Sequence, residues 1–252
     1  MRVKLTVIIF ICLNMLLCAS PQKKVENARA KDLVYQCNMG LFYLNEGNID
    51  EAIKYLNRAL SLNRRYSLAL NSLGLAHSMK GNFAESVKYF QECIAVNPFL
   101  TEAHNYLGTV YQEMGFVDKA EKEFRIAAFD ENYKSRELPY YNLARLYVLR
   151  DKVQEALEYV ERSIEINSSF RMAHNLKGVI LERQLKFSEA IKSYKKALKN
   201  LEGDVDINFN LAVAYFKNNE FSKAKEIFEK INHRVTDLEM KEKIDRYLRM
   251  IK

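Results

Sequence analysis

The feature that most constrains this chain is a small residue that returns at nearly constant intervals along the sequence. The six positions are Gly40, Gly74, Gly108, Ala144, Gly178 and Ala212. Four of the five intervals are 34 residues long and the remaining one is 36. Three further columns of equivalent positions begin at Ala52, Leu56 and Ala59, and each recurs six times in the same register. The first column holds small residues, the second large ones and the third mostly small ones. Such self-similarity predicts six copies of one supersecondary unit.

Each copy has the pattern of two amphipathic helices, because its apolar residues recur three and four positions apart. We expect the small residues where the two helices of a pair cross. The large residue of the Leu56 column then fills the space against the neighbouring pair. One such pair cannot bury both of its apolar faces alone, so the pairs are expected to stack. Only eight glycines and three prolines punctuate the chain, and three of the glycines (Gly47, Gly81 and Gly115) are expected just past a helix end. The sequence predicts an all-α fold.

These columns resemble the tetratricopeptide repeat family. The residues that carry the resemblance are Leu70, Leu73-Gly74, Gly81, Phe90, Asn97-Pro98, His104, Leu107-Gly108, Tyr111, Gly115, Ala120, Phe124 and Ala127. The resemblance implies a right-handed superhelical solenoid of six helical hairpins with a capping helix at its C-terminal end. The implied repeats are 33–66, 67–100, 101–134, 137–170, 171–204 and 205–238, and the capping helix is 239–252.

The first 18 residues have the pattern of a signal peptide that lies outside the repeats. Two basic residues precede a mostly apolar run from Leu5 to Leu17. This run has the length of a signal-peptide core and is short for a membrane span. A buried first helix is the alternative, but the sequence turns polar at Pro21. We therefore expect an exported protein in which residues 19–32 form a linker.

Cys18 closes the apolar run, at the position of the lipidated cysteine of a bacterial lipoprotein. A strong lipoprotein signal has a small residue directly before the cysteine, and Leu17 is not small. Three interpretations therefore stay open: lipidation of Cys18, cleavage nearby by the general signal peptidase, and an uncleaved anchor.

The sequence shows no sign of catalytic, metal or cofactor chemistry. The sequence contains no phosphate-binding loop, dinucleotide motif, nucleophile elbow, His-x-x-x-His or Cys-x-x-Cys. Of the four histidines, His104 and His174 occupy equivalent positions in their repeats. The net charge of +7 is spread over amphipathic helices rather than gathered in a basic stripe, which disfavours nucleic-acid binding. Cys37 and Cys93 are expected to be small buried hydrophobic residues. We expect a protein that is not an enzyme and binds no cofactor, metal or nucleic acid.

The one interval of 36 residues lies between the third and fourth repeats. It is either a loop two residues longer, which costs little entropy, or a family signature. An export signal ending near a cysteine, followed by six such repeats, resembles the outer-membrane pilotin lipoproteins of type IV pilus biogenesis. The matching residues are Asp130, Tyr133, Asn142 and Leu143.

This second resemblance implies a protein-interaction scaffold that is lipid-anchored at the periplasmic face of the outer membrane, or free in the periplasm. Its implied partner is a secretin, the outer-membrane channel of the pilus. The alternatives are a periplasmic adaptor for a protease or cell-wall machinery, and an enzyme such as a transferase that uses the repeats for substrate choice.

In a scaffold of this family the first helix of each hairpin lines the concave, partner-binding side. The residues expected there are Asn71, Asn105, Tyr141, Asn142, Arg145, Val148, Asn175, Phe209 and Phe216. A row of asparagines can clamp an extended peptide backbone, because an amide both donates and accepts hydrogen bonds. The same row is also explained by an asparagine-rich composition or by bonding at helix ends. The aromatic residues supply contact area for a partner, or belong to the core.

Overall fold

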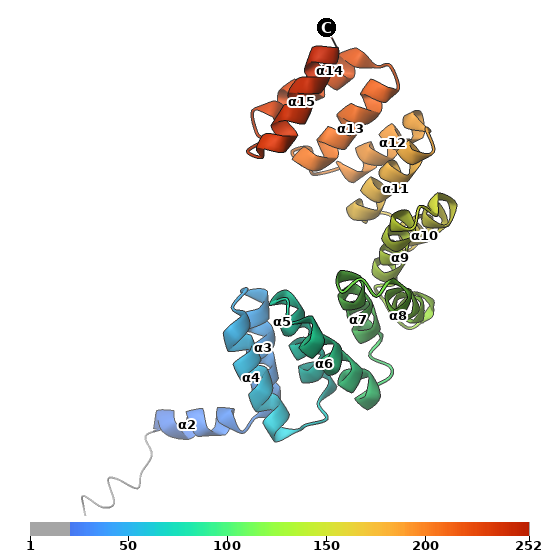
Figure 1. Cartoon of the computed structure of the whole chain (residues 1–252). Helices are drawn as coiled ribbons and strands as arrows, with labels where there is room; N and C mark the ends of the chain where they lie inside the picture. The colour runs from blue at the N-terminus through green and yellow to red at the C-terminus, as the bar shows by residue number, and fades with distance from the viewer. Residues whose placement is uncertain (1–20, 252) are drawn as a thin grey trace, which may run out of the picture. The chain divides into compact units, whose positions relative to one another are not determined.

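The computed structural model describes residues 21–251, and every regular element within that range is an α-helix. The fourteen helices of this described part are labelled α2 to α15 in Figure 1. The predicted signal peptide and Cys18 lie outside the described residues. None of the helices in the described range is long and apolar enough to cross a membrane.

The helices alternate as first and second members of hairpins. The first members are α3 (Leu33–Asn45), α5 (Ser67–Met79), α7 (Thr101–Glu113), α9 (Glu137–Leu149), α11 (Arg171–Arg183) and α13 (Val205–Lys217). The second members are α4 (Ile49–Leu62), α6 (Phe83–Val96), α8 (Val117–Phe129), α10 (Val153–Ile166), α12 (Phe187–Ala197) and α14 (Phe221–Asn232). The last helix is α15 (Leu238–Met250). The predicted all-α fold of sequential helical hairpins is confirmed.

The chain divides into two compact units, and the division falls inside α7, between Val110 and Tyr111. In the N-terminal unit, α3 packs on α4 and α5 packs on α4 and α6. In the C-terminal unit each helix from α8 to α15 packs on the next one in sequence. Each unit therefore buries its apolar faces through contacts between sequence neighbours, as expected for stacked repeats.

The core of the N-terminal unit shows why the repeat needs a small residue opposite a large one. A Cβ atom added to Gly74 would lie 2.7 Å from the Phe90 ring, and one added to Gly40 would lie 2.5 Å from the Leu56 side chain. Phe90 and Leu56 are fully buried by this close approach. The Ser86 hydroxyl donates a hydrogen bond of 2.6 Å to the carbonyl oxygen of Gly74, which ties the second helix to the first.

The core of the C-terminal unit repeats the arrangement and adds the last helix to it. Tyr194 fills the space beside Gly178, and Phe228 is fully buried in the corresponding column. The helix α15 packs on α14 and buries Ile244 completely, in agreement with a capping role. Its first residue Leu238 stays 76% exposed, so the apolar face of α15 does not begin there.

The turns inside the hairpins use a left-handed residue in every repeat, but the residue type changes along the chain. Gly47, Gly81 and Gly115 have φ angles of +74°, +75° and +78°. The corresponding residues of the last three hairpins are Asp151, Leu185 and Asn219, with φ angles of 57°, 59° and 62°. Glycine adopts this conformation without strain, whereas other residues do so at a cost.

The longer connection between the third and fourth repeats runs from residue 130 to 136, between α8 and α9. The Asp130 carboxylate accepts the backbone N–H of Asn132 at 3.0 Å, and the Asp130 carbonyl accepts that of Tyr133 at 3.1 Å. These bonds give the enlarged connection a defined turn, in which an aspartate side chain organises its own backbone.

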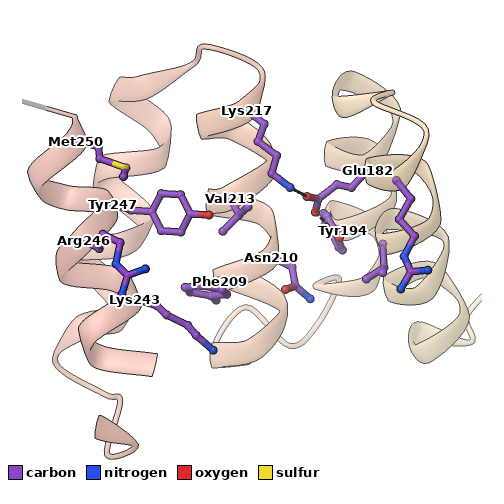
Figure 2. Close-up of a pocket in the computed structure, with 12 residues that line it drawn as sticks. Glu182, Tyr194, Phe209, Asn210, Val213, Lys217, Lys243, Arg246, Tyr247 and Met250 are labelled. Atoms are coloured by element: carbon purple, nitrogen blue, oxygen red, sulfur yellow. Dashed lines mark hydrogen bonds and ion pairs between the residues drawn. The ribbon is translucent and has the colours of Figure 1, made fainter. Parts of the chain in front are cut away.

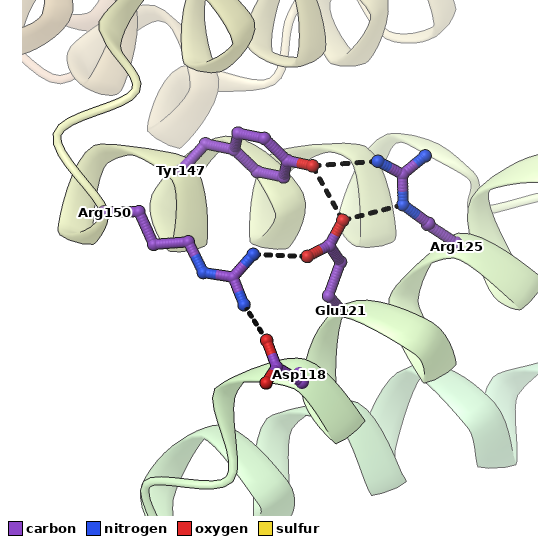
Figure 3. Close-up of polar contacts among 5 residues, drawn as sticks. All are labelled: Asp118, Glu121, Arg125, Tyr147 and Arg150. Atoms are coloured by element: carbon purple, nitrogen blue, oxygen red, sulfur yellow. Dashed lines mark hydrogen bonds and ion pairs between the residues drawn. The ribbon is translucent and has the colours of Figure 1, made fainter.

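A polar network joins α8 to the end of α9 (Figure 3). Glu121 accepts hydrogen bonds from the Tyr147 hydroxyl at 2.7 Å, from Arg125 at 2.9 Å and from Arg150. Burial alone would raise the pKa of Glu121, but these three donors outweigh it and hold that pKa below its usual value. Arg150 also bonds Asp118. The network stabilises a charged carboxylate against the face of the next hairpin.

Residues 19–32 were expected to form a linker, but helix α2 occupies Pro21–Ala30. Proline is favourable in the first turn of a helix, where its missing N–H has no partner to lose, and no glycine follows it before α3. The helix is joined to the first repeat by a hydrogen bond of 2.9 Å from the Gln36 amide to the Arg29 carbonyl, and the Arg29 guanidinium lies over the Tyr35 ring.

Cys37 and Cys93 are buried and carry free thiols. Burial raises the pKa of both thiols, to about 11 for Cys93. Their expected role as small buried hydrophobic residues is confirmed.

Candidate protein-binding pocket

The sequence-predicted binding residues are distributed over both units. Asn71 on α5 and Asn105 on α7 lie in the N-terminal unit, and the other seven lie on α9, α11 and α13 of the C-terminal unit. All nine belong to first helices of hairpins, where the resemblance implied them. Their role in binding stays a prediction.

The asparagine row takes up different contacts in different repeats. Asn71 is buried, and its side-chain oxygen has no hydrogen-bond partner within the described residues. Asn175 instead accepts a hydrogen bond of 3.3 Å from the amide of Asn210 on the neighbouring first helix. The amides of the C-terminal unit therefore link adjacent hairpins in the free chain, and an incoming peptide would have to share them.

The predicted residues on α9 are also engaged with their own chain. The Tyr141 ring packs edge-on against Phe170 with centroids 5.4 Å apart, and the Arg145 guanidinium lies over Tyr141. Val148 is nearly buried, and its carbonyl accepts a hydrogen bond of 3.0 Å from Arg183 on α11. Hence α9 contributes more to packing than to an open surface.

An open pocket of about 700 Å³ lies on the first helices of the last two hairpins and on α15 (Figure 2). The lining residues are Val179, Glu182, Arg183, Tyr194, Phe209, Asn210, Val213, Lys217, Lys243, Arg246, Tyr247 and Met250. We call this the C-terminal pocket. Of the nine predicted residues, Phe209 lines the pocket, and Phe216 contacts the lining residue Tyr247.

The helical period explains how α15 presents several side chains to one hollow. On α15 the lining residues Lys243, Tyr247 and Met250 are spaced four and three apart, so they share one face. The start of α15 is fixed by Asp237, whose carboxylate accepts backbone N–H groups of Glu239 and Met240. Asp204 caps α13 in the same way through the N–H of Ile207 at 3.0 Å.

The floor of the C-terminal pocket is aromatic. The Tyr247 ring stacks on Phe228 with centroids 5.1 Å apart and meets Phe216 edge-on at 5.1 Å. Phe209 meets the same Tyr247 ring edge-on at 6.2 Å. Figure 2 shows the Tyr247 hydroxyl directed toward Val213, across the hollow between α15 and α13. Tyr247 therefore packs the capping helix against these rings and leaves an apolar surface in the pocket that is accessible to solvent.

Glu182 is the one acidic side chain of the pocket, and its charge is already matched. The Tyr194 hydroxyl donates to one carboxylate oxygen at 2.6 Å, and the Lys217 ammonium donates to the other at 2.9 Å. Burial, together with the neighbouring carboxylate, raises the pKa of Tyr194 far above its ordinary value. The tyrosine therefore acts as a fixed hydrogen-bond donor and orients Glu182 as a structural group.

The remaining charges of the rim are basic. Arg183 pairs with the exposed Asp151 at 3.6 Å, and Lys243 pairs with the exposed Glu239 at 2.7 Å. Arg246 forms no ion pair with any residue that the structure describes. Exposed pairs of this kind are weak, so these cations can exchange partners at little cost.

Sequence reasoning missed the contribution of α15. The helix was expected only to cover the end of the stack, yet it supplies Lys243, Arg246, Tyr247 and Met250. Their spacing of three and four residues was visible in the sequence. What could not be read from it is that this face meets α13 and not solvent. Within residues 21–251, no three His, Cys, Asp or Glu side chains gather as metal ligands would.

Two family models match the chain. Residues 33–98 match the model of the tetratricopeptide repeat, and residues 125–243 match the C-terminal ARM domain of tetratricopeptide repeat protein 21. Residues 33–98 therefore carry tetratricopeptide repeats, and residues 125–243 are similar to a domain of a tetratricopeptide repeat protein. Such repeats form scaffolds for protein–protein interaction that are typically non-catalytic.

Two curated relatives match parts of the chain. Human tetratricopeptide repeat protein 21A is 34% identical over 86 residues, which are 34% of this chain and 6% of that protein. The TPR repeat-containing protein MJ1428 of Methanocaldococcus jannaschii is 31% identical over 108 residues, which are 42% of this chain and 18% of that protein. The chain thus spans less than a fifth of either relative, and the likeness concerns the repeat.

Two solved structures have the same fold over most of the chain. PilF of Pseudomonas aeruginosa aligns with a TM-score of 0.78 and 16% identity, over 87% of this chain and 99% of PilF. PilW, a widely conserved type IV pilus biogenesis factor, aligns with a TM-score of 0.73 and 14% identity, over 80% of this chain and 92% of PilW. At these identities the likeness establishes the fold and leaves function open.

Proposed function

We propose that this chain is an exported scaffold, anchored at the periplasmic face of the outer membrane, that assists the assembly or stability of a type IV pilus secretin. The observation that carries the proposal is the order of its parts. A signal ending at Cys18 precedes six repeats, and the single enlarged connection holds Asp130 and Tyr133 just before the Asn142-Leu143 pair. The likeness in fold to a type IV pilus biogenesis factor supports it.

The proposed mechanism divides the work between the two ends of the chain. Lipid on Cys18 holds the scaffold at the membrane, and the first helices of the repeats hold the client. A single acyl chain binds membranes only marginally, so stable anchoring needs the several chains of a bacterial lipoprotein. Bringing the client to the membrane surface then raises its effective concentration there.

Membrane attachment is tested by Cys18→Ala in the full chain, with Cys12→Ala as the matched control in the same segment. We expect Cys18→Ala to move the protein from the membrane to the soluble fraction without changing its helical circular dichroism. Cys12→Ala should stay with the membrane. A Cys18→Ala protein that still sediments with outer membranes would rule out the lipid anchor.

The client is tested by isolating the chain, under native conditions, from the cells that make it. Recovery of a secretin, together with loss of assembled secretin from cells that lack the chain, would support the proposal. Recovery of a protease or a cell-wall enzyme with unchanged secretin would instead support the periplasmic adaptor.

A further inference from the structure

The C-terminal pocket is larger than the packing of a capping helix requires. A cap that only closed the stack would bury the apolar face of α13, but about 700 Å³ remains open between Val179, Val213 and Tyr247. A hollow of this size with an apolar floor and a few polar groups is typical of a site that binds side chains of a partner.

The charge of the lining is unbalanced. Four cations (Arg183, Lys217, Lys243 and Arg246) and one anion, Glu182, line the pocket, and Arg183 and Lys243 also pair with the exposed Asp151 and Glu239 beside it. Both oxygens of Glu182 already accept hydrogen bonds from Tyr194 and Lys217. Glu182 and Lys217 are therefore used within the fold. Arg246, which has no ion pair within the described residues, and the weakly paired Arg183 and Lys243 are available to a ligand.

The available charge is concentrated on α15. Glu239 raises the pKa of Lys243 through its hydrogen bond, and the nearby positive charge of Arg246 opposes that effect. Glu239 is 75% exposed, and Lys243 is 51% exposed. Two like charges that lie close together at the rim of an apolar hollow favour an anionic group between them.

We propose that the C-terminal pocket binds an extended acidic segment of the client protein, with one apolar side chain inserted between α13 and α15. The apolar side chain lies on Tyr247 and Val213. Its flanking carboxylates pair with Arg246 and Lys243, and the Asn210 amide contacts the peptide backbone. This inference rests on the scaffold function proposed above and specifies the chemistry of the client at one place.

A peptide fits the pocket better than a nucleic acid does. The rings of the floor pack on one another, with Tyr247 stacked on Phe228, so they present no row of free faces on which successive bases could stack. The basic residues also surround a single hollow and do not extend as a stripe along the chain.

The proposal is tested with the full chain and a short fluorescein-labelled peptide in which acidic residues flank one phenylalanine. Two companion peptides replace either the acids by their amides or the phenylalanine by serine. A single-stranded oligonucleotide of similar length serves as the other anionic probe. Binding is followed by fluorescence anisotropy at two salt concentrations, because rim ion pairs weaken as salt rises.

The decisive protein variant is the double change Lys243→Glu and Arg246→Glu. Its matched control is Lys241→Glu with Arg249→Glu, which makes the same charge change on exposed residues of α15 outside the pocket. We expect the first pair to weaken binding of the acidic phenylalanine peptide by about tenfold or more and the control pair by less than about twofold. Circular dichroism should show both variants folded.

Three results would overturn the proposal: equal binding of the uncharged peptide, equal weakening by the control pair, or tighter binding of the oligonucleotide. The proposed pilus function is tested separately, by recovery of a secretin with the unmodified chain. A secretin recovered equally well with the Lys243→Glu, Arg246→Glu protein would retain the function and reject the pocket as its site. Peptide binding without secretin recovery would do the reverse.

Discussion

The N-terminal and C-terminal units use the same core and differ on their surfaces. The large residue of the repeat is Leu56 and Phe90 in one unit, and Tyr194 and Phe228 are its counterparts in the other; all four are fully buried. On the first helices, however, the column of Leu41 and Leu75 gains a charge at Arg145, and the column of Ser78 gains a charge at Glu182 and a ring at Phe216 in the C-terminal unit. The columns that fold the repeat are therefore separate from the columns that give each unit its chemistry.

The same separation holds on the second helices. The column that contains Glu121 in the C-terminal unit contains Ile53 and Val87 in the N-terminal unit. In the third repeat the hydrogen-bond and ion-pair network around Glu121 thus replaces the apolar side chain of this column, which is apolar again at Leu157 and Ile191. The two units should respond differently to pH while they respond alike to loss of a core side chain.

The largest expected effect tests the shared core. Phe90→Ala and Phe228→Ala each remove a fully buried ring, and each should lower the free energy of unfolding by about 3–5 kcal/mol. Because repeats contact only their neighbours, hydrogen exchange should accelerate mainly in the unit that carries the change. Urea unfolding followed by circular dichroism measures the total.

Phe99→Ala is the control for this pair, because Phe99 is 92% exposed and its loss should change stability by less than about 0.5 kcal/mol. If Phe90→Ala accelerated hydrogen exchange equally in both units, the two units would unfold together, and the prediction that each has its own stability would be wrong.

Sequence alone predicted the hairpins well because their determinants are local and repeated. The closeness of Gly74 to Phe90 requires a small residue opposite a large one, and that requirement returns with a fixed period. The C-terminal pocket has no such signal. It depends on how α15, packed on α14, places Tyr247 against Phe209 and Phe216 of α13. The sequence does not distinguish Tyr247 from other residues on the same face of the helix.

The asparagines illustrate the same limit. Their spacing places them at similar heights on successive first helices, as the sequence indicated. Which amides meet is decided by the packing of neighbouring hairpins, and Asn175 meets Asn210, 35 residues away, rather than its exact repeat partner. The linker was also misjudged, because nothing in the polar sequence from Pro21 to Ala30 distinguishes a helix held by the first repeat from a free connection.

The next effect concerns alkaline pH and tests the buried Cys93 of the N-terminal unit. The pKa of Cys93 is raised from 9.0 to about 11 by burial, so the unfolded thiol ionises before the folded one. The stability due to the neutral thiol is complete below pH 9 and is lost as pH rises through 11. Two pKa units correspond to roughly 2–3 kcal/mol.

Cys93→Ala removes this titration and keeps a small residue that the same column already contains at Ala59 and Ala127. Chemical unfolding from pH 8 to 11 should therefore show wild type losing stability relative to the variant. Parallel curves for the two proteins would contradict the assignment to Cys93.

A smaller effect, at acid pH, should belong to the C-terminal unit. Glu121→Gln removes the negative charge and one of the two oxygens that accept from Tyr147, Arg125 and Arg150, and should cost about 1–2 kcal/mol at neutral pH. The pKa of Glu121 is lowered, so its contribution is present above pH 4.5 and is lost as pH falls below that value. The difference between wild type and variant should shrink correspondingly.

Glu158→Gln is the matched control, because Glu158 is an exposed residue of α10 with no ion pair within the described residues. Its stability should follow wild type at every pH. An acid-dependent difference of the same size in Glu158→Gln would show that general charge balance, and not the network, sets the acid response.

The smallest effect tests the turns, where the two ends of the chain solve one problem with different residues. Leu185 has a φ of 59° and a side chain that is 74% exposed, so Leu185→Gly relieves backbone strain and gives up little burial. Relief of about 1–2 kcal/mol is partly offset by the greater freedom of glycine in the unfolded chain, which leaves a gain of about 0.5–1 kcal/mol. The reverse change, Gly81→Leu, should destabilise the protein by a similar amount, because Gly81 has a φ of +75°.

Leu149→Gly is the control, because Leu149 is 70% exposed, much like Leu185, but lies at the end of a regular helix with no left-handed backbone. Glycine there should lower the melting temperature. If thermal unfolding showed Leu185→Gly and Leu149→Gly shifting the melting temperature in the same direction, left-handed strain would not be what distinguishes the later turns from the earlier ones.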